Sequence, residues 1–268
     1  MPGTAVVTGG GRGIGRAVAL GLARAGMSVA VLARTGSELV ETVALVEADG
    51  GRAHAESVDV TDADAVAHAF EKILDRLGPV DLLVNNAGTA SALGPVWEVD
   101  AEAWWRDVET SVRGAFLCTR AVLSDMLERR RGRIVNMSSY ASVRPSPYLS
   151  AYAAAKAALL SFTEALAAEA RPFGVAVFVV TPGHVRTAMV RHMLESEAGR
   201  RWLPEVASST PLEPERTADL IAFLASGRGD ALSGRFLHAL DDVEGLAARA
   251  EEIVRDDLYV ARLRRDPL

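Results

Sequence analysis

The sequence predicts an α/β protein built on a doubly wound parallel sheet with helices on both faces. Short apolar runs of strand length alternate with longer segments of helical pattern, which is typical of strands joined by crossover helices. The chain has 268 residues, 49% of them hydrophobic, which is enough for a large buried core. No repeat, low-complexity segment or linker divides it, so we expect a single domain over residues 1–268.

The predicted strands are short runs, most of them mainly apolar. The strands are expected at 5–8, 28–33, 52–57, 82–85, 133–137, 175–180 and 234–239. Helices are expected between them at 13–25, 37–49, 62–77, 101–130, 150–171 and 214–225. Gly26 and Gly50 follow two of these helices, where glycine favours termination, and the pair Thr61-Asp62 is suited to cap a third.

Composition and charge narrow the classes of function. The formal net charge is −6 with both signs well mixed, which favours neither nucleic acid nor an anionic membrane as a partner. No stretch approaches the roughly 20 apolar residues of a membrane span and no signal-peptide pattern is present, so we expect a cytoplasmic protein. Cys118 is the single cysteine and the histidines lack metal-ligand spacing, so neither a disulfide nor a metal site is expected.

A glycine-rich segment joins the first strand to the first helix, with the sequence Thr8-Gly9-Gly10-Gly11-Arg12-Gly13-Ile14-Gly15. Glycines at such a turn let a pyrophosphate approach the helix N-terminus, where backbone amides and the helix dipole favour an anion. The spacing Gly-x-x-x-Gly-x-Gly differs from the commoner Gly-x-Gly-x-x-Gly fingerprint. Its place after an N-terminal strand favours a dinucleotide site over an ordinary tight turn.

The end of the second strand is where a dinucleotide's adenosine ribose is expected. A carboxylate there would hold the 2′-hydroxyl of NAD, but the sequence Leu32-Ala33-Arg34-Thr35 contains no acid. Arg34 and Arg12 can pair with a 2′-phosphate, and Thr35 can donate a hydrogen bond. We therefore expect NADP(H) to be preferred, with NAD(H) possible; the alternative is that both arginines are only solvated.

Two further strand ends carry polar residues. Asp59, followed by Val60, can accept a hydrogen bond from an adenine amino group or simply end the third strand. The fourth strand ends in Asn85-Asn86-Ala87-Gly88, whose small residues would allow a cofactor close to the backbone. The asparagines could equally satisfy exposed strand ends.

A tyrosine and a lysine provide candidate acid–base chemistry. Tyr152 and Lys156 are four residues apart on a predicted helix and so share one face. A free tyrosine has a pKa near 10, and a neighbouring ammonium or an oxidised nicotinamide would favour its phenolate form. Ser139, at the end of the fifth strand, precedes this pair.

The order and spacing of these motifs resemble the short-chain dehydrogenase/reductase family. The matching residues are Thr8, Gly9, Gly13, Gly15, Asp59, Asn85-Asn86-Ala87-Gly88, Ser139, Tyr152, Lys156 and the segment Thr181-Pro182-Gly183-His184-Val185-Arg186-Thr187. The resemblance covers about residues 4–190 strongly and continues more loosely to about 237. It implies a Rossmann-type seven-stranded sheet and hydride transfer between a nicotinamide and a carbonyl or secondary alcohol substrate.

The resemblance also implies a role for each matching residue. Tyr152 would be the general acid and base, Ser139 would hold the reacting oxygen, and Lys156 would bind the nicotinamide ribose and lower the tyrosine pKa. Thr187 would contact the carboxamide or pyrophosphate. The full set of expected cofactor contacts is Thr8, Gly9, Gly11, Arg12, Gly13, Ile14, Gly15, Arg34, Thr35, Asp59, Val60, Asn86, Ala87, Gly88, Tyr152, Lys156, Pro182, Gly183, Val185 and Thr187.

The sequence departs from the family pattern in two places. Ser111 stands where the family usually has an asparagine that helps a water-mediated proton relay, so we expect a working but altered relay; the alternative is that Ser111 only satisfies a helix backbone group. The end of the chain, 241–268, forms an acidic-then-basic tail, predicted helical over 243–265, in place of the family's short terminus. The segment 187–212 is expected to form a substrate lid or a plain surface excursion.

These features favour an NADP-preferring carbonyl reductase or alcohol dehydrogenase that forms a homo-oligomer, a dimer or tetramer as the family often does. A reductase of carbon–carbon double bonds is the alternative among enzymes. A cofactor-binding regulator or scaffold without turnover is the alternative from another class. The sequence does not specify the substrate.

Overall fold

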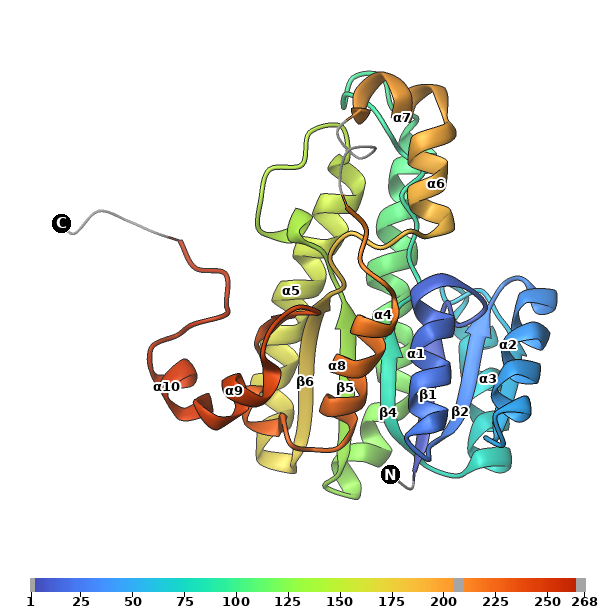
Figure 1. The fold of residues 1–268 in the computed structure, drawn as a ribbon, viewed down its shortest axis with the longest axis vertical. Coiled ribbons are helices and arrows are strands. Elements are labelled where there is room, and N and C mark those ends of the chain that lie inside the picture. Colours follow the sequence, from blue (N-terminus) through green and yellow to red (C-terminus); the bar gives the residue numbers. More distant parts are fainter. Residues whose placement is uncertain (1–2, 205–209, 264–268) are drawn as a thin grey trace.

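The computed structural model describes residues 3–204 and 210–263, and it contains the predicted doubly wound fold (Figure 1). All seven strands are parallel and belong to one sheet of order β3-β2-β1-β4-β5-β6-β7. The strands are β1 (Thr4–Thr8), β2 (Ser28–Ala33), β3 (Ala53–Ser57), β4 (Val80–Asn85), β5 (Gly132–Met137), β6 (Val175–Thr181) and β7 (Phe236–His238). The strand order reverses direction between β1 and β4, which is where such a fold forms its ligand crevice.

The connecting helices follow the predicted order. They are α1 (Gly13–Arg24), α2 (Gly36–Ala48), α3 (Ala63–Leu77), α4 (Ala101–Glu128), α5 (Ser150–Ala170), α6 (Ala188–Glu195), α7 (Glu197–Trp202), α8 (Glu215–Ala225), α9 (Val243–Ala248) and α10 (Ala250–Arg255). The predicted cap of α3 is present, because the Asp62 side chain accepts hydrogen bonds from the amides of Asp64 and Ala65. None of the helices in the described part of the chain is both long and apolar enough to cross a bilayer.

Alternating side chains of β1, β2, β4, β5 and β6 fill two separate cores. Helices α1, α2 and α8 cover one face, where Val7 of β1 and Phe178 of β6 are fully buried. Helices α3, α4 and α5 cover the other face, where Val6 and Val177 are fully buried. Because successive strand residues point to opposite faces, these neighbouring residues supply both cores and fix the register of the sheet.

The C-terminal tail differs from the predicted single helix. Only two six-residue helices form, α9 and α10, and the chain from Asp256 to Leu263 is irregular; Arg264 and Arg265 of the predicted helix lie outside the described residues. The tail lies on the side of the molecule opposite α2 and α3 (Figure 1). The amide of Phe236 in β7 donates to the carbonyl of Tyr259 at 2.8 Å, so the tail covers part of the sheet edge.

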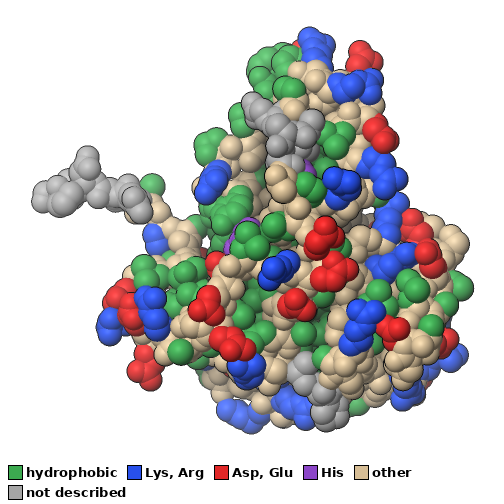
Figure 2. Space-filling view, viewed as in Figure 1, with side chains coloured by type: hydrophobic (Ala, Val, Ile, Leu, Met, Phe, Trp, Pro, Cys, Tyr) green, Lys and Arg blue, Asp and Glu red, His purple; other side chains and the backbone are tan. Residues whose placement is uncertain are grey.

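The surface carries both signs of charge, interspersed over the face shown in Figure 2. Short-range ion pairs account for many of these groups, among them Arg133 with Asp230 at 2.6 Å and Arg228 with Glu244 at 2.7 Å. Among the residues described, no group of three or more His, Cys, Asp or Glu side chains is arranged to hold a metal ion.

Candidate active site

A cleft of ≈250 Å³ opens at the carboxyl ends of the parallel strands, because all of these ends meet at one edge of the sheet. It extends from the end of β2, over the glycine segment, to the start of α6. Its lining residues are Gly9, Gly11, Arg12, Gly13, Ile14, Gly15, Ala33, Arg34, Thr35, Glu38, Val58, Asp59, Val60, Asn86, Ala87, Gly88, Thr89, Thr110, Met137, Ser138, Tyr152, Lys156, Pro182, Thr187, Ala188 and Met189.

The glycine segment forms a close-fitting backbone cradle at the N-terminus of α1. Gly9 and Gly13 adopt positive φ angles of 64° and 55°, a conformation that side-chain-bearing residues rarely adopt. A Cβ atom on Gly15 would lie 2.2 Å from the carbonyl oxygen of Gly9, so only glycine fits there. The free amides of the first helical turn face this cradle, which therefore suits a pyrophosphate.

Side chains from β1 and β4 hold the cradle against the sheet. The Thr8 hydroxyl accepts from the amides of Asn86 at 3.0 Å and Ala87 at 2.9 Å. The Asn86 amide group donates to the carbonyls of Thr8 at 2.9 Å and Gly9 at 3.3 Å. Thr8 is buried behind the cleft and does not line it, so its role in this geometry is to position the residues that do.

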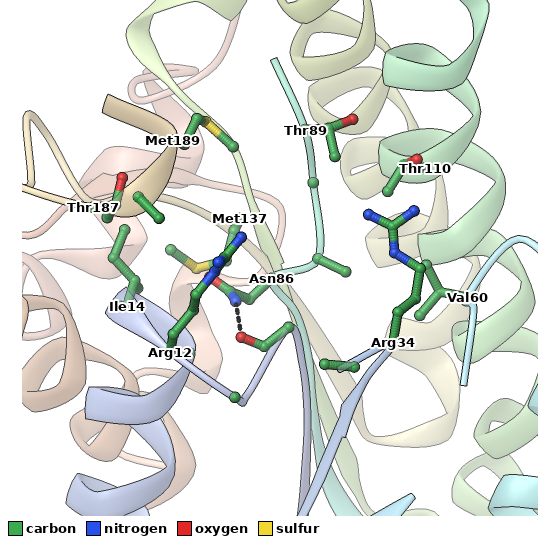
Figure 3. Close-up of a pocket in the computed structure, with 18 of the residues that line it drawn as sticks. Arg12, Ile14, Arg34, Val60, Asn86, Thr89, Thr110, Met137, Thr187 and Met189 are labelled. Carbon is green, nitrogen blue, oxygen red and sulfur yellow. Dashed lines mark hydrogen bonds between the residues drawn. The ribbon is translucent and has the colours of Figure 1, made fainter. Parts of the chain in front are cut away.

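The end of the cleft next to β2, where an adenosine ribose is expected, contains an acid that sequence reasoning missed. Arg12 and Arg34 extend into the cleft from the glycine segment and from the end of β2 (Figure 3). Arg12 pairs with Glu38 at 3.1 Å, and Arg34 lies 3.9 Å from Asp59. Glu38 is in the first turn of α2, where an acidic residue is common because it interacts favourably with the helix dipole. Its position in the sequence therefore gives no sign of a binding role, and only packing brings it to the cleft.

The Asp59 carboxylate is organised by its neighbour Thr61. The backbone amide and hydroxyl of Thr61 both donate to Asp59 Oδ1, at 3.0 and 2.8 Å. Partial burial raises the pKa of Asp59, but the two Thr61 hydrogen bonds and the Arg34 charge outweigh it and leave that pKa below its ordinary value. Asp59 is therefore a carboxylate near neutral pH.

Tyr152 and Lys156 lie on one face of α5, as predicted, and both line the cleft. The Lys156 Nζ is 5.5 Å from the centre of the Tyr152 ring and donates to the carbonyl of Met137 at 2.8 Å. The Ser138 hydroxyl donates to the Lys156 carbonyl at 3.1 Å. These reciprocal bonds fix α5 to the end of β5.

Burial is the largest cause of the pKa shifts of both Tyr152 and Lys156. It raises the pKa of Tyr152 above its ordinary value, and a hydrogen bond with the Ser139 side chain opposes this only in part. It lowers the pKa of Lys156 to about 8. Loss of hydration is the larger of the two causes at Tyr152, and the expected lowering of the Tyr152 pKa by Lys156 stays a prediction. The phenol is protonated at neutral pH.

Ser111 lies beside this pair, buried and without a hydrogen-bond partner for its hydroxyl within the described chain. A Cβ atom on Gly88 would lie 3.3 Å from the Ser111 hydroxyl and 3.4 Å from Lys156 Nζ, so the two polar groups flank the same glycine. The alternative that Ser111 satisfies a helix backbone group is not supported by these contacts.

The loop after β4 is held by a buried acid on α4. Asp107 is 1% exposed, and its carboxylate accepts from the amides of Ser91 at 2.7 Å and Ala92 at 2.9 Å and from the Ser91 hydroxyl at 2.8 Å. The same loop contributes Ala90 and Leu93 to a small apolar cluster that contacts Tyr152. Asp107 thus fixes the loop beside the candidate acid–base residue.

Helices α6 and α7 complete that apolar cluster above the sheet. Thr187 caps α6 by accepting from the amide of Val190 at 3.2 Å, and Met193 and Leu203 are buried in the cluster. The Tyr148 and Trp202 rings stack with centroids 4.8 Å apart. The predicted lid segment 187–212 thus packs over the Tyr152 side of the cleft as far as it is described; residues 205–209 of it lie outside the described residues.

Most of the predicted cofactor contacts line the cleft. Gly183 and Val185 do not: a Cβ atom on Gly183 would meet Leu212 and His238, and Val185 is buried against Leu212. Ser139 and Ser111 are not among the lining residues either. Of the lining residues outside the predicted contact set, Glu38 has no local sequence signal, because packing alone brings it to the cleft. Thr89 and Met137 lie next to predicted motifs, and Met189 lies in the predicted lid segment.

The fold and the glycine-lined cleft are of the dinucleotide-binding type, and the comparisons with known proteins give the family. The family model for short chain dehydrogenases matches residues 3–198. A short chain dehydrogenase of Pseudocercospora fijiensis is 38% identical, over 97% of this chain and 89% of that protein. A 3-oxoacyl-(acyl-carrier-protein) reductase of Synechocystis is 38% identical, over 83% and 88%.

A solved structure is also similar to this chain over most of its length. The actinorhodin polyketide ketoreductase with NADPH superposes with a TM-score of 0.82 at 30% identity, covering 91% of this chain and 97% of its own. This chain belongs to the short-chain dehydrogenase/reductase family. The resemblance drawn from the motifs is confirmed, and with it the oxidoreductase class of enzyme.

Proposed function

We propose that this protein is an NADP-preferring carbonyl reductase or alcohol dehydrogenase with Tyr152 as its general acid and base. The observation that carries the proposal is the Tyr152–Lys156 pair on the wall of a cleft whose other end holds the glycine cradle. The actinorhodin ketoreductase, which is named with NADPH, and the acyl-carrier-protein reductase support a carbonyl as the substrate class.

The residues present fit a nicotinamide dinucleotide. The cradle at Gly15 leaves no room for a side chain, and the first turn of α1 supplies free amides for a pyrophosphate. Arg12 and Arg34 would hold the adenosine end, and Lys156 with Thr187 the nicotinamide end. When bound, the cofactor supplies or accepts the hydride.

Tyr152 would then transfer the proton to or from the reacting oxygen of the substrate. Because burial keeps its pKa high, the phenol is protonated at neutral pH and can donate to the carbonyl oxygen as that oxygen gains negative charge. Ser139, hydrogen-bonded with Tyr152, would orient the same oxygen. In the opposite direction Tyr152 would accept the alcohol proton, which requires a positive charge nearby to favour the phenolate.

Lys156 and Ser111 would return the proton from solvent. The two groups flank Gly88, and the Ser111 hydroxyl is buried without a partner, which suits a water between them. Serine is shorter than the family's usual asparagine and lacks its amide, so we propose a relay that works with altered geometry.

Self-association is a further part of the proposal. Trp105 and Phe116 on α4 are 62% and 47% exposed, and such large apolar side chains favour burial against another protein surface. We propose a homo-oligomer, a dimer or tetramer, formed through α4 and α5. The cytoplasmic location stays a prediction from the sequence.

The test follows the oxidation of NADPH and NADH by absorbance against a panel of ketones, with the wild type and Tyr152→Phe. We expect Tyr152→Phe to lower turnover by at least about 100-fold, since general acid–base catalysis contributes about that much. Tyr259→Phe, in the tail, is the matched control and should keep full activity. Tight cofactor binding by the wild type without turnover of any ketone would contradict the proposed reaction, and faster turnover with NADH would contradict the NADP preference.

A further inference from the structure

The adenosine corner of the cleft is more nearly neutral than its two arginines suggest. Arg12 Nη1 lies 3.1 Å from Glu38 Oε1, and Glu38 itself lines the cleft. Arg34 has a looser partner, Asp59, at 3.9 Å. Of the two acids, Glu38 is the less exposed, at 28% of its side chain against 43%.

Glu38 is fixed in this corner by its backbone. The Thr42 hydroxyl contacts the carbonyls of Gly10, Gly11 and Glu38 at 3.1 to 3.2 Å. A Cβ atom on Gly11 would lie 2.9 Å from the Cβ of Glu38, so the glycine segment and α2 are in direct contact. The neighbouring Leu39 is 1% exposed and anchors the first turn of α2 in the core. The carboxylate therefore stays within reach of Arg12.

We propose that Glu38 sets the cofactor specificity of this cleft by neutralising Arg12 and weakening the selection of NADP over NAD. A 2′-phosphate carries about −1.5 to −2 charges at neutral pH and competes with Glu38 for the same guanidinium. The 2′-hydroxyl of NAD carries no charge and can donate a hydrogen bond to the Glu38 carboxylate. Glu38 thus weakens the binding of NADP and is compatible with the binding of NAD.

This inference rests on the proposed binding of a nicotinamide dinucleotide in the cleft, and it adds a residue that the predicted cofactor set does not contain. The inference also assigns different roles to Arg12 and Arg34. Arg12 is held by a close carboxylate, whereas Arg34 has a partner at the limit of an ion pair. Arg34 is then the main attraction for the phosphate, and Glu38 determines how much Arg12 adds.

The decisive variant is Glu38→Gln, which keeps the shape of the side chain and removes its charge. Dissociation constants for NADPH and NADH are measured without substrate, from the fluorescence of the reduced nicotinamide, so the readout does not depend on turnover. We expect the ratio of NADPH to NADH affinity to rise about fivefold, the scale of one partly exposed charge pair. The rise should shrink at high salt, because exposed charges are screened.

Two further variants isolate the cause. Glu47→Gln removes the same charge from the exposed side of α2, outside the cleft, and should leave the ratio unchanged. Arg12→Gln should lower the affinity for NADPH, and adding Glu38→Gln to it should give a smaller rise than in the wild type, because the pair acts as a unit.

The outcomes separate this inference from the function on which it rests. An unchanged or lower ratio in Glu38→Gln, while both cofactors still bind, overturns the role of Glu38 alone. An equal rise in Glu47→Gln also overturns it, since the effect would then come from overall charge. Failure of the wild type to bind either cofactor would instead overturn the proposed function.

Discussion

Burial of the Lys156 ammonium should destabilise the folded protein, although the proposed proton relay needs that ammonium. Lys156 is 4% exposed, and burial lowers its pKa from the ordinary value of 10.5 to about 8. Each pKa unit corresponds to about 1.36 kcal/mol, so the folded protein at pH 7 carries a cost of about 3 kcal/mol for this ammonium. Replacing it by an apolar side chain of similar length, Lys156→Met, should remove that cost.

The gain in the free energy of unfolding of Lys156→Met is reduced by one lost hydrogen bond, and it depends on pH. Lys156→Met leaves the Met137 carbonyl without its 2.8 Å partner, which costs about 1 kcal/mol. The net gain at pH 7 is then about 2 kcal/mol, or a rise in Tm of about 4 °C. In the unfolded chain the lysine keeps its proton up to about pH 10.5, whereas in the folded protein it loses it near pH 8. The wild type is therefore stabilised as pH rises through this window, and the advantage of the variant disappears.

The assay is thermal and urea unfolding of the cofactor-free protein at pH 7 and pH 10, for the wild type and Lys156→Met. Lys72→Met is the matched control, because Lys72 is 61% exposed and pairs with Glu56 at the surface, so its loss should change stability little at either pH. A Lys156→Met protein that is less stable than the wild type at pH 7, or whose stability difference is the same at pH 10, would refute the burial argument. The same variant should lose turnover, since the proposed relay needs the ammonium.

Two other predictions concern α4. Ser111→Asn should keep turnover within about tenfold, because either side chain can bond the relay water, and loss of turnover with NADPH still bound would show that the position is not interchangeable. Asp107→Ala should lower the free energy of unfolding by about 2–4 kcal/mol, measured in urea, because three hydrogen bonds to a buried carboxylate are lost. Asp107→Asn keeps an acceptor for the Ser91 and Ala92 amides and should lose less; equal losses would assign the effect to charge alone.

Local patterns predicted the fold because each element is defined over a few residues. The apolar runs found the seven strands to within two residues at each end, and the largest differences are at the starts of β4 and β7. The predicted tail helix was wrong because the apolar positions after Val243 do not form one continuous stripe, and the tail packs instead as short turns against the sheet edge.

The sequence by itself determined the parts of the site that depend on chain spacing. A glycine segment between β1 and α1 and a four-residue interval between Tyr152 and Lys156 specify local geometry, and the parallel sheet then brings the strand ends to one edge. Only the tertiary structure decided the electrostatics. Arg12 and Glu38 are 26 residues apart, and Asp107 is 16 residues from Ser91.

Burial gives the physical reason for this division. The ionisation of Tyr152 and Lys156 depends on how much water the surrounding elements exclude, and α6 and α7 contribute to that exclusion from far along the chain. Spacing in the sequence fixes which groups share a face, but not their hydration or the charges opposite them. The sequence therefore identified the candidate acid–base pair, and the packing of distant helices determined its protonation.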